Sequence, residues 1–135
     1  MTVISFKFTK ICAERKEGAK GNINIANNIS VKDVKGIDLK LGSKSERALK
    51  FGFEFEAKYE PEIGNIKLNG DVVWLGKTDK VKEIEKEWAK NKKIAKEVME
   101  DIMGSILNKC NIEALIMSRE MNLPPPVPLP KVKKD

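Results

Sequence analysis

The chain contains few of the side chains that catalyse reactions at neutral pH. Histidine is absent from its 135 residues, which removes the usual general base, the commonest metal ligand and the partner that activates Ser and Cys nucleophiles. Ser105 and Lys109 lie four residues apart on one face of a predicted helix. A serine–lysine nucleophile also needs a buried lysine and an oxyanion hole, and the sequence indicates neither. We therefore expect the protein not to be an enzyme.

Acidic and thiol side chains do not predict a metal site. Glu97, Glu100 and Asp101 occupy neighbouring positions of the predicted helix, and a lysine precedes each glutamate by four residues, a spacing typical of a solvated helix surface with ion pairs. Cys12 and Cys110 lie far apart and in no CxxC arrangement, which favours two free thiols in a reducing compartment. We expect neither a metal nor a cofactor.

The positive charge is concentrated in the first third of the chain. The net charge is +6, and residues 1–48 contain ten cations and five anions. Residues 18–21 form a basic GxxG sequence of the kind with which KH domains clamp a nucleic-acid backbone, but strand-like sequence flanks it, so it predicts a hairpin turn. Only three of the 26 cations are arginine. A nucleic-acid-associated accessory domain is therefore the second choice of function, and nucleic acid the second choice of partner.

Length and composition indicate one soluble domain with a short tail. A chain of 135 residues with 41% hydrophobic and 34% charged residues has enough apolar side chains for one core. No run of 18 apolar residues occurs, and the first 13 residues lack a signal-peptide cleavage pattern. We expect one domain over residues 1–120, an extended proline-rich segment over residues 121–135, and a cytoplasmic protein without membrane insertion.

The strongest secondary-structure signal is strict alternation over residues 49–60. Every odd position is apolar and every even one is polar or glycine, as in a strand of an antiparallel sheet with one covered face. A turn at residues 61–65 and further alternation over residues 66–75 complete a hairpin. Gly70 marks a bulge or a close approach in its second strand.

Two earlier segments are also extended. Residues 4–14 and 23–41 alternate in the same way. Interruptions at residues 27–28 and 35–36 predict that the second of them is kinked or split. Four extended segments thus precede any helical pattern.

After residue 76 the apolar period becomes that of an amphipathic helix. Thr78 is the predicted N-cap, and apolar residues follow at spacings of three and four until about residue 119. We expect one long helix, or two with a break near Asn91, that covers the dry face of a four-stranded antiparallel sheet. Strands first and helix afterwards make this an α+β fold.

The end of the chain is rich in proline. Five of residues 121–132 are proline, which excludes a helix and favours polyproline II geometry. Leu123 and Val127 lie among the prolines and favour a segment that packs on the body over a free, polar linker. Recognition by an SH3-type module, through the PxxP spacing of Pro125 and Pro128, is the alternative.

Four features of the sequence occur together: four extended segments with a hairpin, a long helix with Cys110 late in it, a glycine-spaced strand at residues 63–70, and an Asn-Leu-Pro-Pro-Pro-Val segment at residues 122–127. In this combination the sequence resembles the SecB-type protein-export chaperones. This resemblance implies a four-stranded antiparallel sheet packed on a long helix. It also implies assembly into a dimer or tetramer, ATP-independent binding of unfolded or nascent polypeptides in apolar grooves, and a link to protein export.

Three features differ from that family's pattern. The chain ends at Asp135, without the second helix that follows in the family. Residues 80–94 replace the Asn-Pro and aromatic signature that opens the family's long helix. The net charge is positive, whereas family members are typically acidic, so their docking on the translocation motor is not expected here.

The leading hypothesis is therefore a SecB-like, oligomeric, ATP-independent chaperone whose partners are unfolded polypeptides and further copies of the chain. The expected contact residues are apolar residues on outer strands or the tail that a single helix leaves uncovered. They are Phe6, Phe8, Ile23, Ile25, Trp74, Leu123 and Val127.

Overall fold

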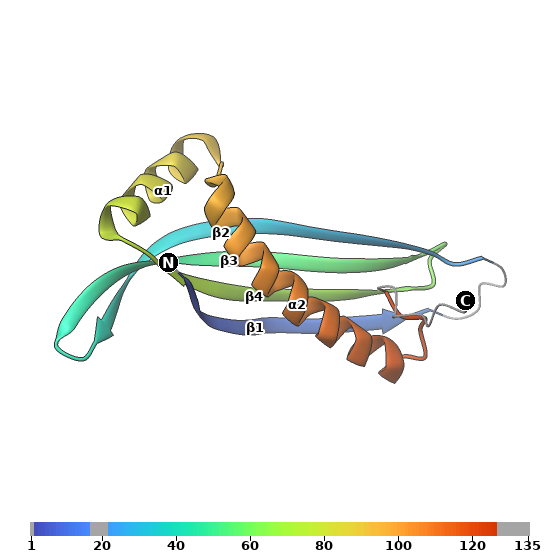
Figure 1. Cartoon of the computed structure of the whole chain (residues 1–135). Coiled ribbons are helices and arrows are strands. Elements are labelled where there is room, and N and C mark those ends of the chain that lie inside the picture. Colours follow the sequence, from blue (N-terminus) through green and yellow to red (C-terminus); the bar gives the residue numbers. More distant parts are fainter. Residues whose placement is uncertain (1, 17–21, 127–135) are drawn as a thin grey trace, which may run out of the picture.

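The computed structural model describes residues 2–16 and 22–126, which form one sheet and two helices (Figure 1). In chain order the elements are β1 (Thr2–Arg15), β2 (Asn24–Leu41), β3 (Lys44–Glu60), β4 (Gly64–Leu75), α1 (Thr78–Asn91) and α2 (Lys96–Glu120). The predicted turn at residues 18–21 and the predicted contact residue Val127 lie outside the described residues.

The strands form an antiparallel sheet in the order β1-β4-β3-β2. β2 with β3 and β3 with β4 are hairpins, whereas β1 pairs with the distant β4, so that β1 and β2 are the edge strands. α2 crosses one face of the sheet diagonally, from the β2 side near its start to the β1 side at its end (Figure 1). The predicted α+β fold, a four-stranded antiparallel sheet covered by a long C-terminal helix, is confirmed.

The alternation in β3 separates an apolar face from a charged face. On the opposite side of the sheet from α2, Lys50 lies 3.8 Å from Asp71 of β4, and Lys67 of β4 lies 3.5 Å from Glu54. From residue 49 to residue 59, the odd-numbered residues of β3 project toward the helices and are at most 2% exposed: Leu49, Phe51, Phe53, Phe55, Ala57 and Tyr59. One dry and one wet face are what the alternation predicts.

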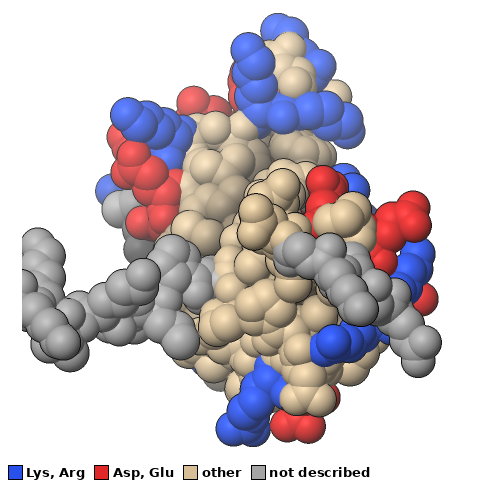
Figure 2. Space-filling view, turned by 90° about the vertical axis from the view of Figure 1, so that its right-hand side faces the viewer, with Lys and Arg blue, Asp and Glu red and all other residues tan. Residues whose placement is uncertain are grey.

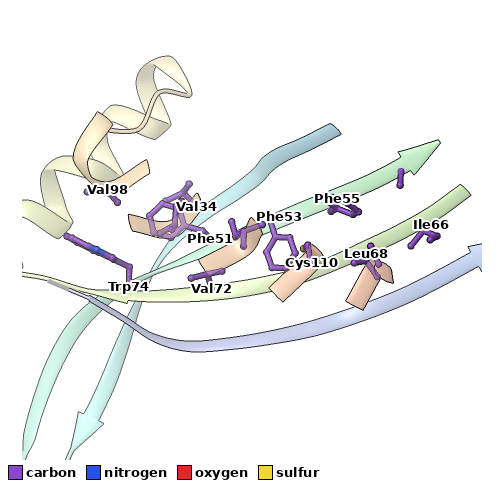
Figure 3. Close-up of a cluster of buried hydrophobic side chains, with 14 of the residues drawn as sticks. Val34, Phe51, Phe53, Phe55, Ile66, Leu68, Val72, Trp74, Val98 and Cys110 are labelled. Atoms are coloured by element: carbon purple, nitrogen blue, oxygen red, sulfur yellow. The ribbon is translucent and has the colours of Figure 1, made fainter. Parts of the chain in front are cut away.

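The core is one layer of side chains between the sheet and the helices (Figure 3). Figure 3 shows Val98 and Cys110 of α2 in this layer beside residues of β2, β3 and β4. The buried residues of α2 recur every four positions, as predicted for an amphipathic helix. They are Val98, Ile102, Ile106, Cys110, Ala114 and Ser118.

β2 is one continuous strand and is not split. It pairs with β3 from Asn24 opposite Glu60 to Leu41 opposite Lys44, with one irregularity between Val31 and Asp33. The predicted interruptions at residues 27–28 and 35–36 are therefore wrong. Pairing with a long neighbouring strand keeps these weak strand formers extended, because strand formation depends on cross-strand context more than on local preference.

The helical region is divided in two, as the alternative with a break near Asn91 predicts. α1 ends at Asn91, and Lys92 adopts a left-handed conformation with φ of 56°. The backbone N–H of Lys92 donates to the carbonyl oxygen of Trp88 at 2.9 Å, which closes the last turn of α1. α2 then starts at Lys96.

Two local predictions at the helix starts are wrong. The N-cap of α1 is Lys77, no side chain caps this end, and Thr78 is already helical. The lysine four residues before Glu97 precedes α2, so it is not on the same helix. Glu97 instead lies 4.0 Å from Lys80 of α1.

Candidate polypeptide-binding surface

The helix side of the sheet is larger than α2 can cover. The 17 residues of β3 span about 56 Å, whereas the 25 residues of α2 span about 38 Å. The outer strands of a four-stranded sheet lie about 14 Å apart, against a helix diameter of about 10 Å. Since α2 also runs diagonally, apolar side chains of both edge strands stay partly exposed.

One partly exposed apolar surface follows β2. Ile25, Ile29 and Val31 are half-buried and lie opposite aromatic residues of β3, so they project toward the helix side as well. One flank of α2 also carries three apolar residues, which are spaced by four and by eight residues along the helix. We call these six side chains the β2 strip: Ile25, Ile29, Val31, Met103, Leu107 and Leu115.

A second apolar surface follows β1 and is built around three phenylalanines. The ring centroids of Phe6 and Phe8 lie 5.1 Å apart, and those of Phe6 and Phe53 lie 5.2 Å apart. Gly70 of β4 lies in register between Phe8 and Phe53, and a β-carbon there would come within 2.7 Å of Cζ of Phe53. The predicted close approach at Gly70 is confirmed, and it makes room for the rings.

A groove separates the start of β1 from the middle of α2. Its volume is ≈ 350 Å³, and its lining residues are Val3, Ile4, Ser5, Phe6, Ser105, Asn108 and Lys109. The strand wall is mainly apolar and the helix wall is polar. Because Ser105 and Lys109 face β1, the flank of α2 with Met103 and Leu107 is the opposite one.

The chain turns back onto the body directly after α2. Asn122 adopts a left-handed conformation with φ of 52°, and its N–H donates to the carbonyl oxygen of Arg119 at 3.2 Å. The N–H of Leu123 donates to the carbonyl oxygen of Ser118 at 2.8 Å. These two bonds form a Schellman motif, which ends the helix and carries Leu123 into the core.

Residues 121–126, which we call the strap, are held by side chains from three strands. Arg15 of β1 donates to the carbonyl oxygens of Met121, at 2.9 Å, and of Asn122. Tyr59 of β3 donates its hydroxyl hydrogen to the carbonyl oxygen of Pro124 at 2.7 Å. The third donor is the amide of Asn27 on β2, which lies 2.7 Å from the carbonyl oxygen of Pro126. We call Arg15, Asn27 and Tyr59 the cradle.

The cradle binds the strap through groups that every residue type possesses. All four hydrogen bonds end on main-chain carbonyl oxygens, which proline retains although it lacks an N–H. Burial raises the pKa of Tyr59 from 10.0 to about 12, so its hydroxyl can still donate in alkaline solution in which a solvent-exposed tyrosine ionises. Figure 2 shows this end of the molecule, with uncharged surface in the middle and charged side chains at the margins.

The structure divides the predicted contact residues among three places. Phe6 and Phe8 lie together on β1. Ile25 is the cross-strand partner of Tyr59, and Leu123 directly precedes the carbonyl that Tyr59 binds, so both lie at the cradle. Ile23, 38% exposed, precedes β2 at the same end.

Trp74 is placed differently from the expectation. It lies on the inner strand β4, is 1% exposed, and its indole nitrogen is 3.4 Å from a carboxylate oxygen of Asp101. Leu123 is also covered, at 7% exposed. The expectation that the helix leaves these two uncovered is wrong, because β1 pairs outside β4 and the Schellman motif folds Leu123 inward. A contact role for the described residues stays a prediction.

The cradle residues are missing from the sequence-based selection, which kept only apolar residues. Two signals point to them. Tyr59 is the only tyrosine and continues the apolar alternation of its strand, and a buried tyrosine hydroxyl needs a hydrogen-bond partner. Arg15 is one of three arginines among 26 cations, and a planar guanidinium suits two neighbouring carbonyl oxygens. Asn27 carries no comparable signal.

Neither α1 nor α2, the helices of the described segments, is both long enough and apolar enough to cross a membrane. Among residues 2–16 and 22–126, no three acidic or cysteine side chains are grouped so that they could hold a metal ion.

Comparison with known proteins shows a likeness of fold. No protein-family model matches the sequence, and no curated protein matches it. Among solved structures, a SecB-like chaperone of Mycobacterium tuberculosis, determined in complex with a ChAD peptide from the HigA1 antitoxin, is similar with a TM-score of 0.55. The alignment covers 99% of this chain and 91% of that one at 7% identity. The chain therefore has a SecB-like fold.

Proposed function

We propose that this protein is an ATP-independent chaperone-like protein that binds unfolded or nascent polypeptides beside α2. The observation that carries the proposal is the partly exposed apolar surface on both edge strands, the β2 strip on one side and the phenylalanines of β1 on the other. The SecB-like fold supports it, since the similar chaperone was solved with a bound peptide. A link to protein export rests on the resemblance alone, and a cytoplasmic location rests on the sequence; both belong to the proposal.

Hydrophobic burial supplies the driving force in this proposal. A client segment that covers these side chains gains about 25 cal/mol for each Å² of apolar surface removed from water, before the cost of ordering the segment is subtracted. No nucleotide is needed for such binding. The groove between β1 and α2 adds polar partners for the client backbone through Ser105 and Asn108.

Self-association is a further part of the proposal. Ile112 and Ile116 of α2 are 52% and 40% exposed, and they lie one helical turn apart on the side of the helix that faces away from the sheet. Exposed isoleucines on a long helix favour contact with a second copy of the chain.

The direct test is light scattering from a chemically denatured client protein diluted into buffer without nucleotide. We expect an equimolar amount of this protein to suppress the aggregation of the client, and to do so in high salt as well, because apolar contacts do not weaken with salt. Aggregation that is unchanged at several-fold excess of the protein contradicts the proposal.

A pair of neighbouring substitutions shows whether the apolar face is responsible. Phe8→Ser removes a ring from the phenylalanine cluster. Lys7→Ser changes the adjacent residue, which lies on the charged face, opposite Asp71 in the register of β1 and β4. We expect the first to weaken suppression and the second to leave it intact. Circular dichroism of both variants, run first, shows whether each is folded.

The same salt series tests the alternative of nucleic-acid binding. Contacts to phosphates lose affinity steeply as salt rises. Several lysines of the charged face lie close to carboxylates, among them Lys35 beside Asp33 at 3.9 Å, which reduces the net positive field there. Tight, salt-sensitive binding of a labelled oligonucleotide, without suppression of aggregation, makes the alternative the better description.

A further inference from the structure

The strap shows how the body holds an extended polypeptide. Residues 121–126 contain three consecutive prolines, and the body contacts their main chain from three different strands. A segment tethered only as a structural end needs no such set of donors, since exposed carbonyl oxygens are satisfied by water. Tyr59 and Asn27 donate to the carbonyl oxygens of Pro124 and Pro126, a spacing of two residues that matches an extended chain. Arg15 instead donates to the carbonyl oxygens of Met121 and Asn122, where α2 ends in its Schellman motif.

The side-chain contacts of the strap add a pocket to this backbone site. Leu123 is 7% exposed and belongs to the hydrophobic core cluster, and Pro126 is also buried. Pro125 between them is exposed. Two buried side chains three residues apart therefore flank the carbonyl contact of Pro124, as in a bound peptide with two anchoring side chains.

Resting on the proposed function, we propose that Asn27, Tyr59 and the pocket of Leu123 form a binding site for extended, proline-containing client segments, and that residues 123–126 of the strap are its resident occupant, which a client displaces. The strap is covalently attached, so its local concentration at the cradle is in the millimolar range or above. It therefore excludes weak ligands and yields to clients that also bind the apolar surfaces beside α2. In the unoccupied protein Leu123 and Tyr59 thus stay buried.

The test is to weaken the same contact from its two sides in the full-length protein. Leu123→Ala weakens the strap and leaves the cradle complete, so we expect the affinity for a labelled, permanently unfolded client to rise at least about threefold. Tyr59→Phe and Asn27→Ala remove donors that strap and client share, so we expect these variants to bind the client no better than the wild type, and each to lose affinity when combined with Leu123→Ala.

Matched controls separate this effect from a loss of stability. Asn65→Ala removes an amide that lies 3.3 Å from Glu56 on the charged face, and it is expected to leave the affinity unchanged. Ile102→Ala removes a buried side chain of α2 about five helical turns before the strap, and tests whether any core truncation raises affinity. Pro126→Gly loosens the strap without removing a core leucine, and serves if Leu123→Ala fails to fold.

A second probe is a labelled synthetic peptide of residues 121–130. We expect it to bind Leu123→Ala more tightly than the wild type, and a peptide with serine at position 123 to bind neither. An unchanged client and peptide affinity in both Leu123→Ala and Pro126→Gly overturns the inference, and so does a rise in Ile102→Ala of equal size. If the peptide binds Leu123→Ala but no client binds any variant, the site stands and the proposed function fails.

Discussion

The hydroxyl of Tyr59 donates a hydrogen bond of 2.7 Å to the carbonyl oxygen of Pro124, and this bond joins an inner strand of the sheet to the segment after the last helix. The two residues are 65 positions apart in sequence. Tyr59 is 1% exposed, so the carbonyl oxygen of Pro124 is the hydrogen-bond partner that its buried hydroxyl requires.

Loss of the Tyr59 hydroxyl is expected to destabilise the fold modestly. Tyr59→Phe leaves the carbonyl oxygen of Pro124 without this donor, at a cost of about 1 kcal/mol in the free energy of unfolding near neutral pH. Urea unfolding of wild type and variant measures the difference. Equal stabilities would mean that water replaces the hydroxyl at no cost.

Stability is expected to fall in alkaline solution. Burial raises the pKa of Tyr59 from 10.0 to about 12 and that of Cys110 from 9.0 to about 12. At pH values between the unfolded and the folded pKa, the folded state binds more protons than the unfolded state. The free energy of unfolding therefore has its full value below about pH 9 and decreases as the pH rises toward 12. Urea unfolding at about pH 8 and about pH 11 should show a smaller loss for Tyr59→Phe than for the wild type.

The two cysteines are expected to react at very different rates. Cys12 is exposed on β1, whereas Cys110 is buried and burial raises the pKa of its thiol to about 12. The thiolate is the reactive form, so a thiol reagent should modify one cysteine per chain quickly and the second only with unfolding. Cys12→Ser should abolish the fast phase. A fast phase that survives this substitution would show that Cys110 becomes accessible in the native state.

Two glycine-to-alanine substitutions are expected to have opposite effects. A β-carbon at Gly70 would meet Phe53 and the main-chain oxygen of Lys7, whereas nothing lies within 4 Å of one at Gly104. We expect Gly70→Ala to lower the free energy of unfolding by about 1–3 kcal/mol. Gly104→Ala, in the exposed interior of α2, should raise it by about 0.5–1 kcal/mol. Thermal unfolding of both variants checks the signs.

Charge on the outer side of α2 is expected to reduce self-association. Lysine at both Ile112 and Ile116 should lower the mass measured by light scattering after gel filtration, because a contact between copies would have to bury the added charges. Lysine at both Ser43 and Ser45, which are exposed at the β2–β3 turn away from α2, adds the same charge and should leave the mass unchanged. A wild-type protein that is already monomeric would contradict the proposed assembly.

The fold was predictable because its signals are local. The alternation of β3 from Leu49 to Tyr59 and the four-residue spacing of buried side chains in α2 are each read from a dozen neighbouring residues. Both patterns arise because one side of the strand or helix is buried and the other is not. In a two-layer protein each strand and helix buries a single side, so the patterns are clear. The break after Asn91 is also local, since polar residues interrupt the apolar spacing there.

The site was harder to predict because it depends on distant pairings. The apolar alternation around Trp74 would be the same in an edge strand. Only the pairing of β1 with β4 makes β4 an inner strand. Asn27 interrupts an apolar pattern, but the structure places it opposite Ala57 and beside Pro126. Apolar character therefore identifies the face of each strand, whereas the donors of the cradle become apparent only when β1, β2 and β3 meet the strap.

The pairing of β1 with β4 also affects how the protein is made. Thr2 lies opposite Leu75, so during synthesis the first strand has no partner until four strands have left the ribosome, whereas β2, β3 and β4 can form hairpins as they emerge. Closing such a long loop is slow compared with forming a hairpin. Phe6 and Phe8 thus reach their native neighbours, Gly70 of β4 and Phe53 of β3, only after both of those strands have been made.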